Sequence, residues 1–83
     1  MLNPSHLRTL LVDYLEIYGL FVKHMSSDAI DHSMVEAINQ VGHIMGIRTI
    51  AEFVEDEATL VALRRLGVDY AQGHALHRPE WLP

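Results

Sequence analysis

The chain has 83 residues, of which 49% are hydrophobic and 20% are charged, and it contains no cysteine. This length fits one small domain, and the apolar content is that of a folded chain and not of a disordered one. The absence of cysteine excludes disulfides and zinc–thiolate sites. Eleven acidic and six basic residues give a net charge of −5, so we expect neither nucleic acid nor an anionic membrane surface as a partner.

The sequence also lacks the usual signals for membranes and secretion. No apolar run approaches the ~20 residues that a membrane-spanning helix needs. The first residues, Met1–His6, lack the basic flank and the apolar core of a secretory signal, so we expect a cytoplasmic protein. A fold of this size buries only about 60% of its unfolded surface, and we expect it to be marginally stable without a partner.

The first segment, residues 5–22, is ambiguous. Its leucines and tyrosines fit a helical stripe, and spacing alone slightly favours a helix. The part from residue 12 to residue 18 also fits a strand. In a strand, the side chains would alternate between one face with Val12, Tyr14, Glu16 and Tyr18 and another with Asp13, Leu15 and Ile17.

The strongest predicted helix covers residues 28–45. Ser27 or Asp28 can cap its start, and Gly46 can end it in a left-handed conformation. Its apolar residues recur at steps of three and four, and we expect this stripe to face the core: Ile30, Met34, Val35, Ala37, Ile38, Val41 and Met45. The methionines at positions 25, 34 and 45 are interpreted as core residues.

Two strands and a second helix are predicted after Gly46. The short β-branched run 47–54 is typical of a strand, and the segment 68–72 between two glycines predicts another. The helix is predicted over residues 56–66, with acidic residues at its start and Gly67 as its stop. Its apolar stripe consists of Leu60, Leu63 and Leu66. Alternating helices and strands with short connections favour an α/β fold with a parallel sheet.

Four separate motifs follow one another along the chain: Leu15-Glu16-Ile17-Tyr18-Gly19, Phe21-Val22, Thr49-Ile50-Ala51-Glu52-Phe53-Val54-Glu55, and Asp69-Tyr70-Ala71-Gln72-Gly73 with a later Arg78-Pro79. In order and spacing they resemble the C-terminal part of an EAL domain. That family comprises bacterial phosphodiesterases that hydrolyse the second messenger cyclic di-GMP. The resemblance covers roughly residues 7–79.

The resemblance implies a partial (β/α)₈ TIM-like barrel with one inverted strand in the whole fold. This chain would supply about the last three βα units, with parallel strands near 12–18, 47–54 and 68–72. The first of these would then be a strand, against the slight preference from spacing. Active sites in such barrels lie at the carboxyl ends of the strands, and Glu16, Glu52 and Gln72 fall there, with side chains pointing inward.

Phosphodiester hydrolysis needs an activated water and neutralised charge on the phosphoryl oxygens, and two Mg²⁺ or Mn²⁺ ions can supply both. The resemblance matches Glu52 to the family's catalytic Glu and Gln72 to its Gln. Glu16 occupies the position of the catalytic Lys, and Tyr18 that of the following Asp. The family's Asp-Asp pair, Glu-Ala-Leu motif and Asn strand do not occur in this chain. We therefore predict that the chain alone is not an enzyme.

A metal or ligand site receives little support from the remaining residues. Glu16 and Glu52 could in principle join His74 or His77 as oxygen and nitrogen ligands. We prefer the interpretation that Glu16 faces water or pairs with Arg48, and we expect no metal or cofactor. Candidate ligand-binding residues are Arg78 and Pro79, which match the end of the family pattern.

Three strands of eight cannot close a barrel, so we expect two open sheet edges and an exposed inner face with Tyr14, Ile50 and Tyr70. Trp81 is a candidate for covering an exposed edge. We favour a non-catalytic remnant that acts through protein–protein contact or self-association, and we expect a homo-oligomer or a partner on the open face. Two alternatives remain: a split phosphodiesterase that needs the missing N-terminal half, and weak cyclic di-GMP binding through Gln72 and Arg78.

Overall fold

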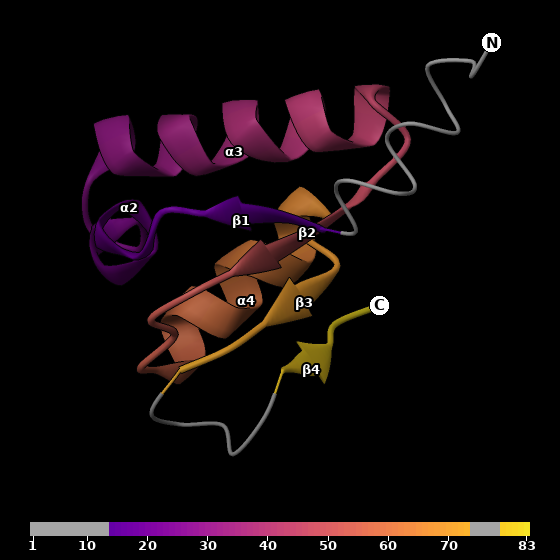
Figure 1. Ribbon diagram of the computed structural model, residues 1–83. Coiled ribbons are helices and arrows are strands. Elements are labelled where there is room, and N and C mark those ends of the chain that lie inside the picture. The colour runs from indigo at the N-terminus through magenta and orange to yellow at the C-terminus, as the bar shows by residue number, and fades with distance from the viewer. Residues whose placement is uncertain (1–13, 74–78) are drawn as a thin grey trace, which may run out of the picture.

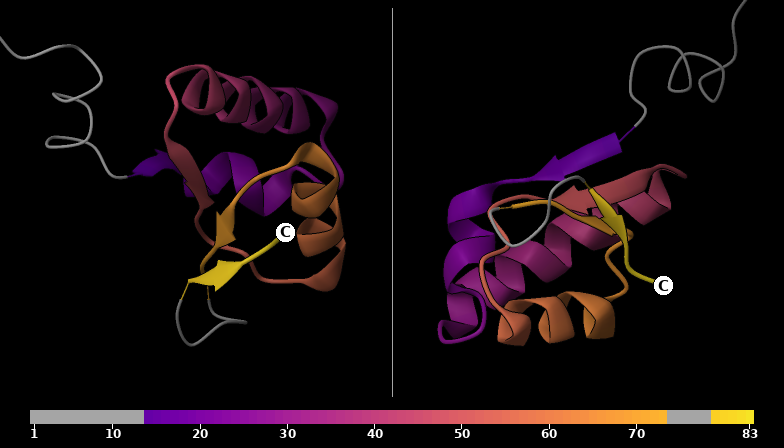
Figure 2. Two further views of the ribbon diagram at one scale, coloured as in Figure 1. Left: turned by 90° about the vertical axis from the view of Figure 1, so that its right-hand side faces the viewer. Right: turned by 90° about the horizontal axis from the view of Figure 1, so that it is seen from below.

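A four-stranded sheet with all its helices on one side is the main feature of the computed structural model, which describes residues 14–73 and 79–83 (Figure 1). The strand order is β1-β2-β3-β4; the first three strands are parallel and β4 is antiparallel to β3. In the right-hand view of Figure 2, α3 and α4 lie below the strands, on one side of the sheet. The elements are β1 (Tyr14–Ile17), α2 (Gly19–His24), α3 (Ala29–Ile44), β2 (Arg48–Ala51), α4 (Glu57–Leu66), β3 (Tyr70–Ala71) and β4 (Glu80–Trp81).

Strand β1 corrects the slight preference that spacing gave to a helix. Residues 14–17 form a strand whose register pairs Glu16 with Ile50, and a short helix, α2, follows; residues 5–13 lie outside the described part. Ile17 is fully buried and Leu15 is half-buried on the helix side. These two residues can be buried together only when the backbone is extended, so pairing with β2 decides the outcome.

Helix α3 begins and ends where its capping residues predict. The side chain of Asp28 accepts hydrogen bonds from the backbone N–H groups of Ile30 (2.9 Å) and Asp31 (3.1 Å). These bonds satisfy N–H groups that have no partner inside the helix. Gly46 follows the helix with a φ of 77°, a conformation that glycine adopts without steric cost.

The buried face of α3 differs from the expected apolar stripe. Ile30 is 75% exposed and Val41 is 52% exposed. Two residues of the expected stripe do face the core, since Val35 is buried and Ile38 packs half-buried against it, and Asn39 and Gly42 complete the buried face. A Cβ at position 42 would lie 2.6 Å from the Thr49 methyl carbon, so glycine permits this close approach. Of the predicted core methionines, Met25 is buried, whereas Met34 and Met45 are exposed.

Helix α4 follows its sequence pattern closely. The side chain of Asp56 accepts a hydrogen bond from the Thr59 backbone N–H (2.8 Å), and this bond lowers the pKa of Asp56. Leu60 and Leu63 are buried against the sheet. Gly67 ends the helix with a φ of 80°. None of the three helices in the described part of the chain has the length and apolar character needed to cross a bilayer.

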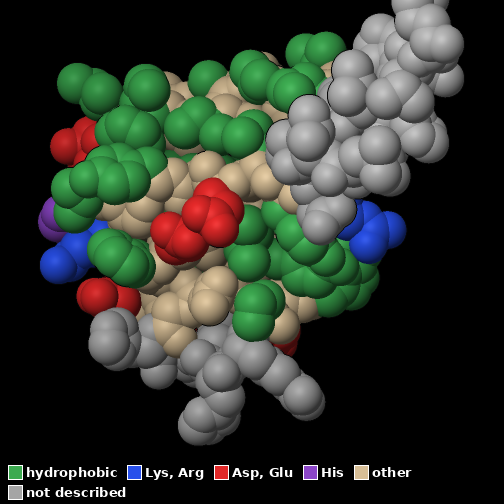
Figure 3. Space-filling model, in the orientation of Figure 1, with side chains coloured by type: hydrophobic (Ala, Val, Ile, Leu, Met, Phe, Trp, Pro, Cys, Tyr) green, Lys and Arg blue, Asp and Glu red, His purple; other side chains and the backbone are tan. Residues whose placement is uncertain are grey.

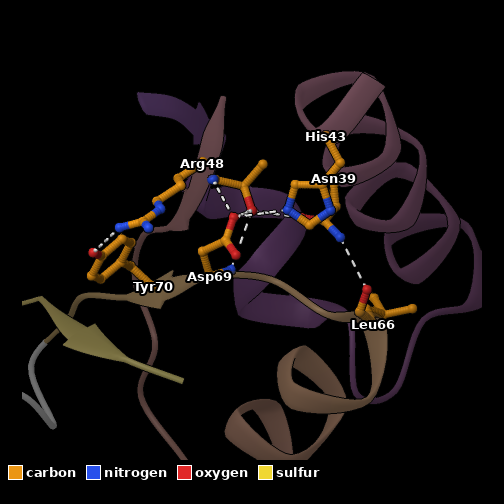
Figure 4. Close-up of polar contacts among 7 residues, drawn as sticks. Asn39, His43, Arg48, Leu66, Asp69 and Tyr70 are labelled. Carbon is orange, nitrogen blue, oxygen red and sulfur yellow. Dashed lines mark hydrogen bonds and ion pairs between the residues drawn. The ribbon is translucent and has the colours of Figure 1, made fainter. Parts of the chain in front are cut away.

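A polar network joins α3, β2 and the turn before β3 (Figure 4). The carboxylate of Asp69 accepts hydrogen bonds from the Thr49 backbone N–H (2.9 Å) and lies 2.8 Å from His43 Nε2. The Thr49 hydroxyl donates to Asn39, whose amide donates to the Leu66 carbonyl (3.0 Å). Each buried polar atom of Asn39 and Thr49 therefore has a partner. The network fixes the amino ends of two neighbouring strands to the helix layer.

Strand β4 covers the outer edge of β3, as Trp81 suggested. Its register pairs Trp81 with Tyr70 and Glu80 with Ala71. The expectation of two open edges is therefore wrong for β3, because the chain's own last residues supply the missing hydrogen-bond partner. In the described part of the chain, β1 pairs only with β2 and is the remaining edge strand.

We expect Thr49→Val to lower the free energy of unfolding by about 1–3 kcal/mol, because the change keeps the shape but removes the hydroxyl that satisfies the buried Asn39 carbonyl. Urea unfolding followed by circular dichroism measures the effect. Ser33→Ala removes a hydroxyl from an exposed position of α3 and should leave the midpoint within experimental error. An equally stable Thr49→Val variant would show that the network does not hold the sheet to the helices.

Candidate functional site

The helix-free face of the sheet carries the residues that the sequence placed inside a barrel. We call this surface, lined by Tyr14, Glu16, Ile50, Tyr70 and Trp81, the inner face. Figure 3 looks onto it and shows acidic side chains together near the middle, with hydrophobic side chains beside them. Tyr14 and Tyr70 meet edge to face with ring centroids 5.4 Å apart. No described helix covers this face.

Two of the three predicted site residues meet at the carboxyl ends of the strands. Glu16 is exposed on β1, and Glu52 follows β2 directly and is half-buried. Gln72 follows β3 with an exposed side chain. Its backbone N–H donates to Ala51 O (2.9 Å), and its carbonyl accepts from Val54 N–H (3.0 Å). Gln72 therefore holds the segment around Glu52 through its main chain.

The pKa of Glu52 is raised above its ordinary value of 4.5. Partial burial is the largest cause, and the negative charge of Glu16 and a hydrogen bond between the two carboxyl groups add to it. A lysine at position 16 would have the opposite effect, because a positive neighbour favours the ionised carboxylate. The site thus has two acids sharing one location, with no basic partner for either among the ion pairs of the described residues.

Two motif glycines explain how the segment after β2 is held. A Cβ at Gly73 would overlap the backbone of Val54, and a Cβ at Gly19 would overlap the ring of Phe53. Phe53 itself has a φ of 60°, a sparsely populated conformation for a bulky residue. Residues from an earlier and a later motif therefore pack closely against this segment. The strained backbone of Phe53 lies next to Glu52.

Of the two possibilities in the sequence interpretation, that Glu16 faces water or pairs with Arg48, the first agrees with the structure, since Glu16 is exposed. Arg48 has other partners. Its guanidinium donates to the Tyr70 hydroxyl (3.2 Å) and lies 4.9 Å from the Trp81 ring centroid. Arg48 starts β2, whereas Glu16 lies beside Ile50 further along the strands. The separation along the strand and the aromatic neighbours keep this cation at the amino end of the inner face.

Tyr18 and Pro79, the other predicted residues in the described part of the chain, add no metal ligands. Tyr18 is exposed and packs its ring edge to face against Phe21 (5.5 Å), so the position of a family Asp carries no carboxylate. Pro79 is exposed. Arg78, His74 and His77 lie outside the described residues.

The residues present do not fit a two-metal centre. Within residues 14–73 and 79–83, no three His, Asp or Glu side chains gather in a way that could hold a metal ion. Hard divalent cations need several oxygen ligands, and two carboxylates fall short of two such sets. We derive no metal-dependent step from this arrangement.

Comparison with known proteins identifies the family. The EAL domain model matches residues 1–79, and the chain therefore belongs to the EAL domain family. It is similar to a cyclic di-GMP phosphodiesterase, PdeB, of Shewanella oneidensis (45% identical over 76 residues) and to PdeA of Borreliella burgdorferi (38% identical). Each match covers 92% of this chain but only 9% and 11% of the relative.

Solved structures confirm the partial barrel. The phosphodiesterase PaMucR, in complex with cyclic di-GMP, superposes with a TM-score of 0.76 at 33% identity, covering 95% of this chain and 32% of that one. An EAL domain protein from Listeria monocytogenes superposes with a TM-score of 0.74 at 31% identity, covering 90% and 30%. The fold is thus part of an EAL TIM barrel, with three parallel strands and an added antiparallel one.

Sequence reasoning missed two features, one at each end of the strands. One is the contact between His43 and Asp69 (2.8 Å), which joins α3 to the turn before β3 and which no motif or spacing in the sequence indicates. The other is the left-handed Phe53, because no glycine or asparagine marks a positive φ there.

We expect Glu16→Gln to lower the pKa of Glu52, because the substitution removes the neighbouring negative charge. Carboxyl carbon chemical shifts followed against pH measure the change, and Glu36→Gln on the exposed side of α3 is the matched control. Because the pKa of Glu52 is higher in the folded chain than the ordinary value of 4.5, the free energy of unfolding falls as pH rises from below 4.5 through the folded pKa. Glu16→Gln should make this fall smaller. An unchanged Glu52 titration would contradict the contact between the two acids.

Proposed function

We propose that this chain is a non-catalytic part of an EAL domain that acts through protein contact. The observation that carries the proposal is the meeting of Glu16 with Glu52. At this location the family resemblance expects a lysine beside a glutamate. Two acids repel the phosphoryl oxygens that a hydrolytic site must neutralise, and one of them already holds its proton more tightly than usual.

Completing the barrel would not remove this obstacle. Glu16 and Tyr18 belong to the chain itself, so a second chain that supplied the missing strands would still face a reversed charge. This argument disfavours the split phosphodiesterase. It applies equally to cyclic di-GMP binding, because the dinucleotide carries two phosphate charges that would approach the same acids.

The exposed aromatic side chains of the inner face support a function through protein contact. Tyr14 is 47% exposed and Trp81 is 46% exposed, and the strand register puts both side chains on the inner face. Aromatic residues exposed together on one face are typical of interaction surfaces. The partners we consider are a second copy of the chain and other proteins of cyclic di-GMP signalling.

A chimera tests the loss of catalysis. In it, this chain replaces the matching 76 residues of the Shewanella relative. We expect at least ~100-fold slower hydrolysis of cyclic di-GMP than by that relative, because a group that stabilises phosphoryl charge is replaced by one that repels it. Chromatography of the linear product, with Mg²⁺ or Mn²⁺ present, measures the rate.

Restoring both residues in the chimera, Glu16→Lys with Tyr18→Asp, should recover much of the rate and also shows that the chimera folds. Tyr18→Asp alone is the matched control and should stay slow, because the charge reversal remains. Hydrolysis by the unsubstituted chimera at the relative's rate would refute the non-catalytic assignment.

Self-association has its own measurement. We expect the purified chain at tens of micromolar to sediment as a dimer or a larger species, because the exposed rings leave water on association. Sedimentation velocity over a concentration series detects this, and the sedimentation coefficient should fall on dilution. A compact monomer across the whole series would contradict self-association.

A further inference from the structure

Strand β4 is bound to β3 by its main chain and by side chains on both faces of the sheet. Its register pairs Trp81 with Tyr70, and the Leu82 N–H donates to the Asp69 carbonyl (2.9 Å). On the inner face, the Trp81 ring centroid lies 4.8 Å from that of Tyr70, and the Arg48 guanidinium lies over the Trp81 ring. Leu82 is buried in the hydrophobic core. Residues 80–82 are therefore an integral part of this sheet.

The edge of β3 that β4 covers is the edge that a complete barrel needs. The chain belongs to the EAL family, and its fold is part of an EAL TIM barrel. A closed barrel has no free strand edges, because its last strand pairs with its first. β3 is the last of the three parallel strands in chain order, and β2 occupies its other edge. A strand that closes the barrel must therefore bind β3 where β4 now lies.

One strand edge has room for one partner strand. The outward N–H and C=O groups of β3 that bond to β4 are the groups that a closing strand would use. β4 is only two residues long, whereas strands of about five or six residues are typical. A closing strand of ordinary length would thus form more main-chain bonds than β4 does, and could displace it.

We propose that residues 79–83 form a displaceable edge strand, which covers β3 while the barrel is open and must leave β3 before a closing strand can bind. An uncovered strand edge is a template for unwanted pairing with other chains, and β4 removes it. The proposal does not depend on which chain supplies the closing strand, because any such strand meets the same edge. It goes beyond the proposed function, since it concerns the edge of β3 and not the charge at Glu16.

A reversible cross-link between β3 and β4 tests the proposal in the chain itself. The chain contains no cysteine, so Ala71→Cys with Glu80→Cys supplies the only two thiols, on residues that are register partners. The Cα atoms of such partners lie about 4.5–5.5 Å apart, which a disulfide can span. Oxidation should raise the melting temperature of this variant by at least about 5 °C over its reduced form, because the disulfide holds an existing arrangement.

The same cross-link should have the opposite effect in the chimera with the Shewanella relative, which contains this chain and supplies the strands that complete the barrel. There the disulfide keeps β4 on β3 and excludes the closing strand. We expect oxidation to lower the melting temperature of the chimera's EAL domain by at least about 5 °C and to speed its cleavage by trypsin at least about threefold. Calorimetry and gel electrophoresis measure the two effects, and a cooperative transition of the reduced chimera shows that it folds.

The single variants Ala71→Cys and Glu80→Cys are the matched controls, since neither can form the cross-link and both should be insensitive to oxidant. Trp81→Ala gives a second comparison without any thiol. It should lower the melting temperature of the chain, because the ring loses its packing on Tyr70. It should leave that of the chimera unchanged, where β4 is displaced.

Opposite signs of the disulfide effect in the chain and in the chimera support the displaceable edge strand. A disulfide that stabilises both proteins overturns it, because β4 and the closing strand would then be bound together. Failure of the disulfide to form in the chain also overturns it, because β4 would then not pair with β3. None of these results uses the hydrolysis rate, so the non-catalytic assignment is tested separately.

Discussion

The hydrogen bonds around Asp69 are the constraint on which the site geometry depends. One carboxylate accepts from the Thr49 backbone N–H and contacts His43, while the Thr49 hydroxyl continues the network to Asn39 (Figure 4). These bonds fix the amino ends of β2 and β3 to α3. Since β1 pairs with β2 in parallel register, fixing one end of the sheet also sets which residues are level at the other end. The pairing of β1 with β2 sets Glu16 level with Ile50, and Glu52 follows two residues further along the chain, so the two acids lie close together.

The residues at each helix end were enough to predict where the helices begin and end. Which side chains are buried depends on contacts between elements that are far apart in the sequence, and was predicted only in part. Asp56 and Gly67 bound α4 because a cap and a left-handed glycine act on their own neighbours. The whole buried face of α3 could not be predicted from the spacing of apolar residues, because it also contains an asparagine and a glycine. Asn39 is buried because Thr49 offers it a hydrogen bond, and that partner lies on another element.

The candidate site was predictable where alternation and register suffice. Once residues 14–17 are taken as a strand, alternation places Glu16 inward, and parallel pairing brings it to the end of β2. Alternation also puts Arg48 on the inner face, but it does not give the partners of its side chain. Its aromatic partner Trp81 comes from β4, a two-residue strand too short for a periodic signal. A cation–π contact across a strand that the sequence does not reveal decided where this side chain lies.

Position 16 sets the charge beside Glu52 on the inner face. A lysine at position 16 would neutralise Glu52 within the same chain, leaving Arg48 as a second cation on the inner face and giving that face a positive balance suited to phosphate. With Glu16, the acidic end loses its internal partner, and the face becomes negative at one end and positive at the other. The proposed loss of catalysis therefore rests on this one change of charge beside Glu52.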